Sequence, residues 1–311
     1  MDDQGIDLAR EALKNLKLFW SLDDSDIAVT RLGGLTNLVF RVDHGGEQYV
    51  LRLPGKGTEE YINRANEAQA AQAAAMAGVS PDVIHVDAKS GVMVTRLVDD
   101  AVTMSPEKFK TIAGAPGRAG EALRRLHTSG AVFATEFNLF KMIDEYLKVL
   151  AGKDAELPTG YHDVVREAEG VRKALDAHKL PLAACHCDPL CENFLDQGQA
   201  RMWIVDWEYS GMNDPMWDLG DLSVEGSFTA AQEEEMIRAY FGGAPSAAER
   251  GRIVIYKAMC DLLWTLWGLI QHANKNPVDD FWAYSVNRFE RCKTLMADPS
   301  FFTHVAAVAK G

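Results

Sequence analysis

The periodicity of the sequence changes near residue 99, and this change constrains the fold more than any other feature. Before it, five short strand-like segments are separated by turns and by one Ala-rich helical segment at 61–77. After it, helical patterns dominate, with two short apolar strands near 183–187 and 202–206. The expected helices of this second part cover about 106–128, 138–150, 161–178, 230–241, 249–273 and 279–296.

This pattern predicts an α+β fold made of two lobes. Residues 1–98 form the smaller lobe, a five-stranded antiparallel sheet with one helix. Residues 99–311 form the larger, mainly helical lobe.

Composition narrows the classes of partner. The net charge is −13 and the pI about 5.1, with no dense Lys/Arg run, so nucleic acid is not an expected partner. No apolar run approaches the ~20 residues of a membrane span, and the acidic N-terminus does not resemble a signal peptide. The sequence therefore predicts no stable membrane insertion and a cytoplasmic location.

Five cysteines, an odd number in a long chain, do not suggest a disulfide framework. Three cysteines lie close to His186 in the sequence: Cys185, Cys187 and Cys191. A zinc site is the alternative interpretation of this cluster. In an extended segment, however, the two cysteines next to His186 point away from it, and no second ligand pair follows. Buried thiols are the favoured interpretation, and the role of these cysteines stays open.

The segment from His186 to Asn193 has the form H-x-D-x-x-x-x-N, and the apolar strand that follows it ends in Asp206 and Glu208. Phosphoryl transfer needs such a set, because an Asp must orient the attacking hydroxyl and other oxygen ligands must hold Mg²⁺ against the phosphates. We therefore expect Asp188 to be the catalytic base. Asn193 and Asp206 are the expected metal ligands, with Glu208 as a further one.

The first lobe contains candidate nucleotide-binding residues. A turn at Gly33–Asn37 joins two strands, and small residues there let backbone amides approach a phosphate, which makes Gly34, Thr36 and Asn37 candidates. Arg52 ends the third strand as a cation for the phosphates, and Glu67 on the following helix is placed to pair with it. The backbone of the segment between the lobes, at Thr95 and Leu97, is expected to hold adenine.

Together, these motifs resemble the choline/ethanolamine kinase family, within the aminoglycoside phosphotransferase and protein-kinase-like superfamily. The likeness runs over about residues 27–290 and implies a bilobal kinase fold that uses ATP and Mg²⁺. It also implies that Asp218 braces the catalytic loop. Arg52 supports the narrower family, where protein kinases have Lys. Cys187 departs from many relatives, and Leu190 replaces a polar residue found in some eukaryotic choline kinases.

The substrate signal comes from the segment Trp264–Gln271 and the helix that follows it. The resemblance implies that Trp264, Trp267 and Tyr284 line a pocket for a trimethylammonium group, with Glu225 as a nearby carboxylate. A quaternary ammonium has no N–H to donate, so aromatic faces suit it. A hydrophobic core stripe is the alternative interpretation of the two tryptophans.

These observations predict a kinase of a small amino alcohol, with choline as the leading acceptor. The alternatives are ethanolamine, a methylated aminoethanol or an aminoglycoside-like alcohol. A catalytically inactive kinase fold used as a binding module is a further alternative, although Asp188, Asn193 and Asp206 are all present. The sequence leaves open the exact acceptor, the pathway and the oligomeric state, for which a homodimer is one alternative.

Overall fold

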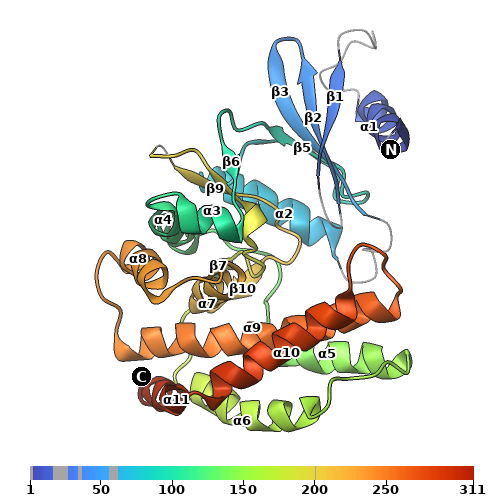
Figure 1. Ribbon diagram of the computed structural model, residues 1–311. Coiled ribbons are helices and arrows are strands. Elements are labelled where there is room, and N and C mark those ends of the chain that lie inside the picture. Colours follow the sequence, from blue (N-terminus) through green and yellow to red (C-terminus); the bar gives the residue numbers. More distant parts are fainter. Residues whose placement is uncertain (1–2, 17–26, 34–36, 56–61, 200) are drawn as a thin grey trace.

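A computed structural model of the chain describes residues 3–16, 27–33, 37–55, 62–199 and 201–311. The first described part is a five-stranded antiparallel sheet in the order β1-β2-β3-β5-β4, as the sequence predicts. The strands are β1 (Ala28–Gly33), β2 (Leu38–His44), β3 (Glu47–Leu53), β4 (Val83–Val86) and β5 (Met93–Arg96). Helix α1 (Asp3–Leu16) lies against this sheet through Ala9 and Leu13 (Figure 1).

Helix α2 (Arg64–Met76) is the single helix inserted between β3 and β4. It begins after Asn63, whose side chain accepts hydrogen bonds from the N–H groups of residues 65 and 66, three residues later than the alanine pattern alone predicts. Four of its buried alanines belong to the large apolar core that includes the second part, so the helix packs on that core and its N-terminal turn lies next to β3. Its first turn therefore brings Arg64 and Glu67 close to β3.

The second part is mainly helical, and its large apolar core is separate from the core of the sheet and α1. Its elements are β6 (Val102–Thr103), α3 (Pro106–Thr111), α4 (Ala115–His127), α5 (Leu139–Gly152), α6 (Tyr161–Ala177), β7 (Ala183–Cys185), β8 (Phe194–Asp196), β9 (Met202–Ile204), β10 (Gly211–Asn213), α7 (Met216–Glu225), α8 (Ala230–Phe241), α9 (Ala247–Ala273), α10 (Phe281–Ala297) and α11 (Pro299–Lys310). The predicted bilobal α+β fold is confirmed (Figure 1).

Two expectations about the helices need correction. The single helix predicted at 106–128 is two helices, α3 and α4, because Gly114 adopts a left-handed φ of 76° and Pro116 opens the next helix. The sequence also gave no sign of α7, which lies between β10 and α8. Nearly every residue of α7 is buried, so it has no apolar stripe for periodicity to detect.

Two small sheets hold the loops that matter for function. In one, β7 pairs with β10, and in the other β8 lies between β6 and β9. The loop 186–193 connects β7 to β8, and the loop 205–210 connects β9 to β10. Both loops link the same two sheets and therefore run side by side. A hydrogen bond joins them, from the N–H of Val205 to the carbonyl of Asn193 at 2.9 Å.

Helix α9 crosses the helical lobe and contacts α5, α6, α7, α10 and α11. In the described part of the chain, it is the helix long and apolar enough to cross a membrane, but 83% of its apolar window is buried by other elements. Such burial is typical of a core helix. The approach of α7 is close, since a Cβ at Gly220 would lie 2.7 Å from the carbonyl oxygen of Ile253.

Candidate active site

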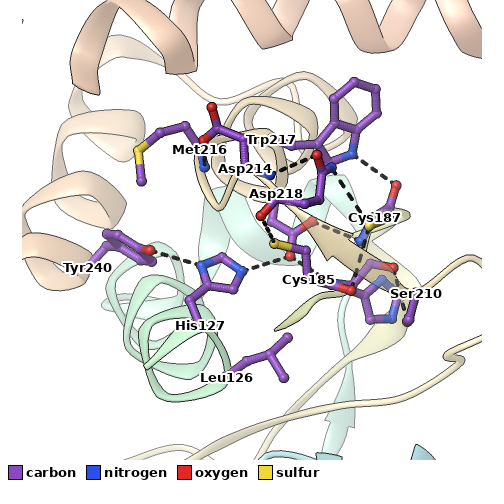
Figure 2. Close-up of polar contacts among 12 residues, drawn as sticks. Leu126, His127, Cys185, Cys187, Ser210, Asp214, Met216, Trp217, Asp218 and Tyr240 are labelled. Carbon is purple, nitrogen blue, oxygen red and sulfur yellow. Dashed lines mark hydrogen bonds and ion pairs between the residues drawn. The ribbon is translucent and has the colours of Figure 1, made fainter. Parts of the chain in front are cut away.

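The start of the catalytic loop is held by Asp218, which is fully buried at the beginning of α7. Its two carboxylate oxygens accept hydrogen bonds from the backbone N–H groups of His186 and Cys187, both at 2.8 Å. His127 of α4 contacts the same carboxylate at 2.9 Å and is itself bonded to Tyr240 (Figure 2). Asp218 therefore fixes the backbone immediately before Asp188.

The two loops carry backbone strain next to their functional residues. Cys187 and Asp206 both adopt a left-handed φ of 68°, a conformation that costs a non-glycine residue about 1–3 kcal/mol. Surrounding contacts maintain both conformations: Trp217 donates to the carbonyl of Cys187 at 3.0 Å, and His186 Nε2 bonds to the carbonyl of Val205 at 2.9 Å. These two backbone conformations turn the loops so that Asp188 and Asp206 lie in one site.

Asp188 is half-buried, and Asn193 anchors its loop by donating from Nδ2 to the Asp188 carbonyl at 3.0 Å. Burial raises the pKa of Asp188 well above its ordinary value, and the charges of Asp221 and Asp206 raise it further. A carboxylate with a raised pKa is a better proton acceptor. The chemistry available to Asp188 is therefore that of a general base.

On the side of the sheet, Arg52 lies among three carboxylates. It forms an ion pair with Glu67, as the sequence suggested, and its Nη2 lies 3.1 Å from Glu208 and 3.5 Å from Asp206. Arg64 also contacts Glu67 at 2.8 Å and Glu208 at 3.5 Å. Arg52 Nε and Nη1 have no hydrogen-bond partner among the described residues, so this guanidinium has donors to offer an anion.

The same carboxylates form a candidate metal centre. Oxygen atoms of Glu67, Asp206 and Glu208 all lie within 4.8 Å of one another. Burial raises the pKa of Glu208 to about 7, and the neighbouring Asp206 contributes. A set of converging carboxylate oxygens suits a hard divalent cation such as Mg²⁺, which would neutralise this repulsion. Glu67 was not expected here as a metal ligand.

The other residues predicted to bind the nucleotide do not all lie where the sequence suggested. Asn37 donates to Glu208 at 3.2 Å and accepts from the N–H of Gly55 at 3.3 Å, so it joins the turn to the metal centre. Gly34 and Thr36 lie outside the described residues. Thr95 lies within β5, and the N–H of Leu97 already donates to a carbonyl of β3 at 3.1 Å, so this N–H is not free for adenine.

Aromatic side chains from α9 and α10 form the opposite side of the site. Trp264 packs edge-on against Tyr209, with ring centroids 5.3 Å apart, and Trp267 packs against Tyr284 at 5.9 Å. The guanidinium of Arg288 lies 4.6 Å from the Tyr284 ring and pairs with Glu225 at 2.6 Å. The structure thus brings the predicted aromatic residues and Glu225 into one region.

Comparisons with known proteins agree with this geometry. The model of the phosphotransferase enzyme family matches residues 28–253. A crystal structure of a choline/ethanolamine kinase family protein from Mesorhizobium loti is 66% identical, covers 99% of this chain and 100% of its own, and superposes with a TM-score of 0.90. The chain belongs to the choline/ethanolamine kinase family.

More distant relatives of this kinase support the same family assignment. Protein LicA of Haemophilus influenzae is 26% identical over 304 residues, covering 94% of this chain and 87% of LicA. The crystal structure of the choline kinase LicA from Streptococcus pneumoniae is 28% identical, with a TM-score of 0.77 and coverage of 95% and 99%. The chain is thus a phosphotransferase of the choline/ethanolamine kinase type, as the resemblance implied.

The cysteines of this kinase do not form a separate reactive centre in the described residues. Cys185 and Cys187 are fully buried, and burial raises the pKa of both thiols well above the ordinary value. Cys185 lies within metal-binding distance of His127 and Asp218, but hydrogen bonds already join those two residues to each other and to the catalytic loop. The contacts are those of a structural core.

Sequence reasoning missed four residues of this kinase that belong to the site. They are Arg64, His127, Asp221 and Arg288. The nearest signal was spacing: Asp218, Asp221 and Glu225 recur at intervals of three and four, which places them on one face if the segment is helical. Without a predicted helix at 216–225, that spacing had no structural meaning.

We expect Gly268→Ala to weaken both the fold and the amine side of the site. A Cβ at Gly268 would lie 2.4 Å from Ser285 Oγ and 2.6 Å from Tyr284 Cδ1, so α9 and α10 would have to separate. Overpacking of this kind costs about 1–3 kcal/mol. Thermal unfolding should show the loss, and KM for the acceptor should rise more than KM for the nucleotide. Gly170→Ala, on the open face of α6, is the control.

Proposed function

We propose that this kinase transfers the γ-phosphoryl group of ATP, with Mg²⁺, to the hydroxyl group of a small amino alcohol, with choline as the leading acceptor. The observation that carries the proposal is the position of Asp188. Burial raises its pKa, and the charges of Asp206 and Glu208 on the nucleotide side and of Glu225 near the aromatic side raise it further. A hydroxyl at Asp188 would have phosphate on one side and its amine on the other.

The nucleotide half supports ATP as the donor. Arg52 offers donors to the phosphates, and Glu67 fixes the arginine in place. Asn193, Asp206 and Glu208 would hold Mg²⁺, which neutralises charge on the transferring phosphoryl group when bound. A crystal structure of LicA in complex with AMP, 29% identical to this chain, supports nucleotide binding by this kinase. Use of ATP also favours the cytoplasmic location inferred from the sequence.

Asp188 orients the acceptor hydroxyl and takes its proton as the oxygen attacks the γ-phosphorus and the bond to the β-phosphate oxygen breaks. Its raised pKa suits this task. Asp218 keeps the loop in place through the backbone of His186 and Cys187. With the base and the proposed metal ligands present, an inactive binding module is the weaker alternative.

The amine side favours choline among the acceptors. Trp264 and Trp267 lie one turn apart on α9, and Tyr284 packs against the second of them. Each aromatic face contributes about 0.5–2 kcal/mol to binding of a quaternary ammonium. Ethanolamine is the second candidate, and mouse ethanolamine kinase 2, 25% identical over 290 residues, is among the relatives. An aminoglycoside would need more polar partners than these rings supply.

Trp264→Leu tests the acceptor directly. Loss of the ring should raise KM for choline about 2- to 30-fold, the range that corresponds to one cation–π contact. KM for ATP should change little. If the wild type phosphorylates kanamycin, its turnover of kanamycin should change little as well. Trp282→Leu is the matched control, because Trp282 lies on α10 against His272 and not among these aromatic residues. An unchanged KM for choline would show that Trp264 is an ordinary residue of the hydrophobic core and does not bind the acceptor.

A further inference from the structure

Helix α7 presents three acidic residues along one face. Asp218, at its start, braces the catalytic loop, and Glu225, at its end, pairs with Arg288. Asp221 lies between them, one turn after Asp218, and is fully buried. A buried carboxylate is costly unless it has partners, so Asp221 needs a reason to be there.

The partners of Asp221 are incomplete. Its Oδ2 accepts a hydrogen bond from the indole N–H of Trp264 at 3.2 Å. The thiol of Cys260 also interacts with the carboxylate, but its Sγ lies 3.3 Å from the carbonyl of Lys257, which competes for the same hydrogen. Oδ1 has no hydrogen-bond partner among the described residues, and no ion pair within 4 Å joins Asp221 to a described cation.

The nearby arginines offset the charge of Asp221 only in part: burial and the charge of Glu225 raise the pKa of its carboxyl well above the ordinary value, and Arg288 lowers it. Arg288 is shared between Glu225 at 2.6 Å and Asp261 at 3.2 Å, and Arg291 binds Asp261 at 2.6 Å. Three carboxylates, Asp221 included, thus share two guanidinium groups in this part of the site. A substrate cation would supply the missing positive charge.

Asp221 also touches the aromatic side of the site, because its Oδ2 is bonded to the indole of Trp264. Among the charged neighbours of Asp188, Asp221 has the largest effect on the pKa of the base. Burial raises the pKa of Tyr284, Arg288 lowers it, and the charges of Glu225, Asp188 and Asp221 raise it further. Asp221 is therefore near both the base and the aromatic side of the site.

We propose that Asp221 accepts a hydrogen bond from the ammonium N–H of the acceptor and thereby determines how well the site takes primary and tertiary amino alcohols relative to choline. The proposal rests on the proposed function and deepens it. Trp264 would hold Oδ2 and leave Oδ1 for the substrate. Choline has no N–H and would gain only the charge of Asp221, whereas ethanolamine and dimethylaminoethanol would gain a directed, charge-assisted hydrogen bond as well.

The test compares kcat/KM for choline, dimethylaminoethanol and ethanolamine in the wild type and in Asp221→Asn. The substitution keeps the size of the side chain and an acceptor for Trp264 but removes the charge. We expect kcat/KM for the two N–H substrates to fall at least about 10-fold further than that for choline. Glu225→Gln removes one charge a turn away on the same helix, and should lower all three values by a similar factor.

A ratio between substrates within one variant does not depend on the fraction of folded enzyme. If Asp221→Asn does not accumulate, Asp221→Ser, smaller and still able to accept from Trp264, replaces it in the same comparison. Equal losses for all three substrates, or no loss, would overturn the role of Asp221 as an N–H acceptor. A wild-type enzyme that phosphorylates none of the three would instead overturn the proposed function.

Discussion

Asp188→Asn is expected to lower kcat for amino alcohol phosphorylation about 10²- to 10⁴-fold, the usual contribution of a general base. The amide keeps the size of the side chain but cannot take the hydroxyl proton. Nucleotide affinity should change little, because Arg52, Glu67 and the carboxylates of the second loop are untouched. Steady-state kinetics and titration with ADP measure the two effects separately.

The same variant should be at least as stable as the wild type. The raised pKa of Asp188 means that the folded state favours the protonated form. The ionised carboxylate therefore costs stability, a cost that begins above the unfolded pKa and is complete above the folded pKa. Asp188→Asn removes this cost at neutral pH. Near-wild-type activity would contradict the assignment of Asp188 as the base. A much lower melting temperature would contradict the inference that its ionised carboxylate destabilises the folded state.

Asp218→Ala is expected to have the largest effect on stability, with a loss of at least about 3 kcal/mol. Asp218 is fully buried and accepts from two backbone N–H groups and contacts His127. Bonds to a charged group contribute about 1.5–3 kcal/mol each, and removing the carboxylate leaves those donors unpaired in the core. Chemical denaturation measures the loss.

The kinetic effect of Asp218→Ala separates its role from ordinary packing. Because Asp218 holds the backbone before the base, kcat should fall well below the wild-type value even at temperatures where the variant is folded. Asp163→Ala is a matched control, since Asp163 lies on the surface of α6 and pairs with an exposed arginine. A folded Asp218→Ala enzyme with wild-type kcat would show that the loop does not need this brace.

The sheet and the catalytic motif could be read from the sequence because their signals are local. Strand alternation and the turn at Asp43–Gly46 predict the sheet, and the spacing from Asp188 to Asn193 and Asp206 indicates phosphoryl transfer. The break between α3 and α4 was missed because the apolar pattern continues across Gly114. Helix α7 was missed because it is buried on all sides.

The missing site residues depend on contacts between distant segments. His127 meets Asp218 across 91 residues, and Asp221 meets Trp264 across 43. No local pattern distinguishes such residues from ordinary helix positions. The resemblance supplied Glu225 and the aromatic residues, but whether Trp264 binds a cation or fills the core depends on its partners, and the hydrogen bond to Asp221 entered only with the fold.

The most direct test of the central claim is identification of the product by ³¹P NMR. The purified enzyme is incubated with ATP, Mg²⁺ and choline, and then with ethanolamine in place of choline, with Asp188→Asn as the control. The account predicts ADP and an equal amount of a new phosphate monoester on the hydroxyl of the amino alcohol, absent with the variant. Formation of ADP and inorganic phosphate alone, with no ester for either acceptor, would contradict it.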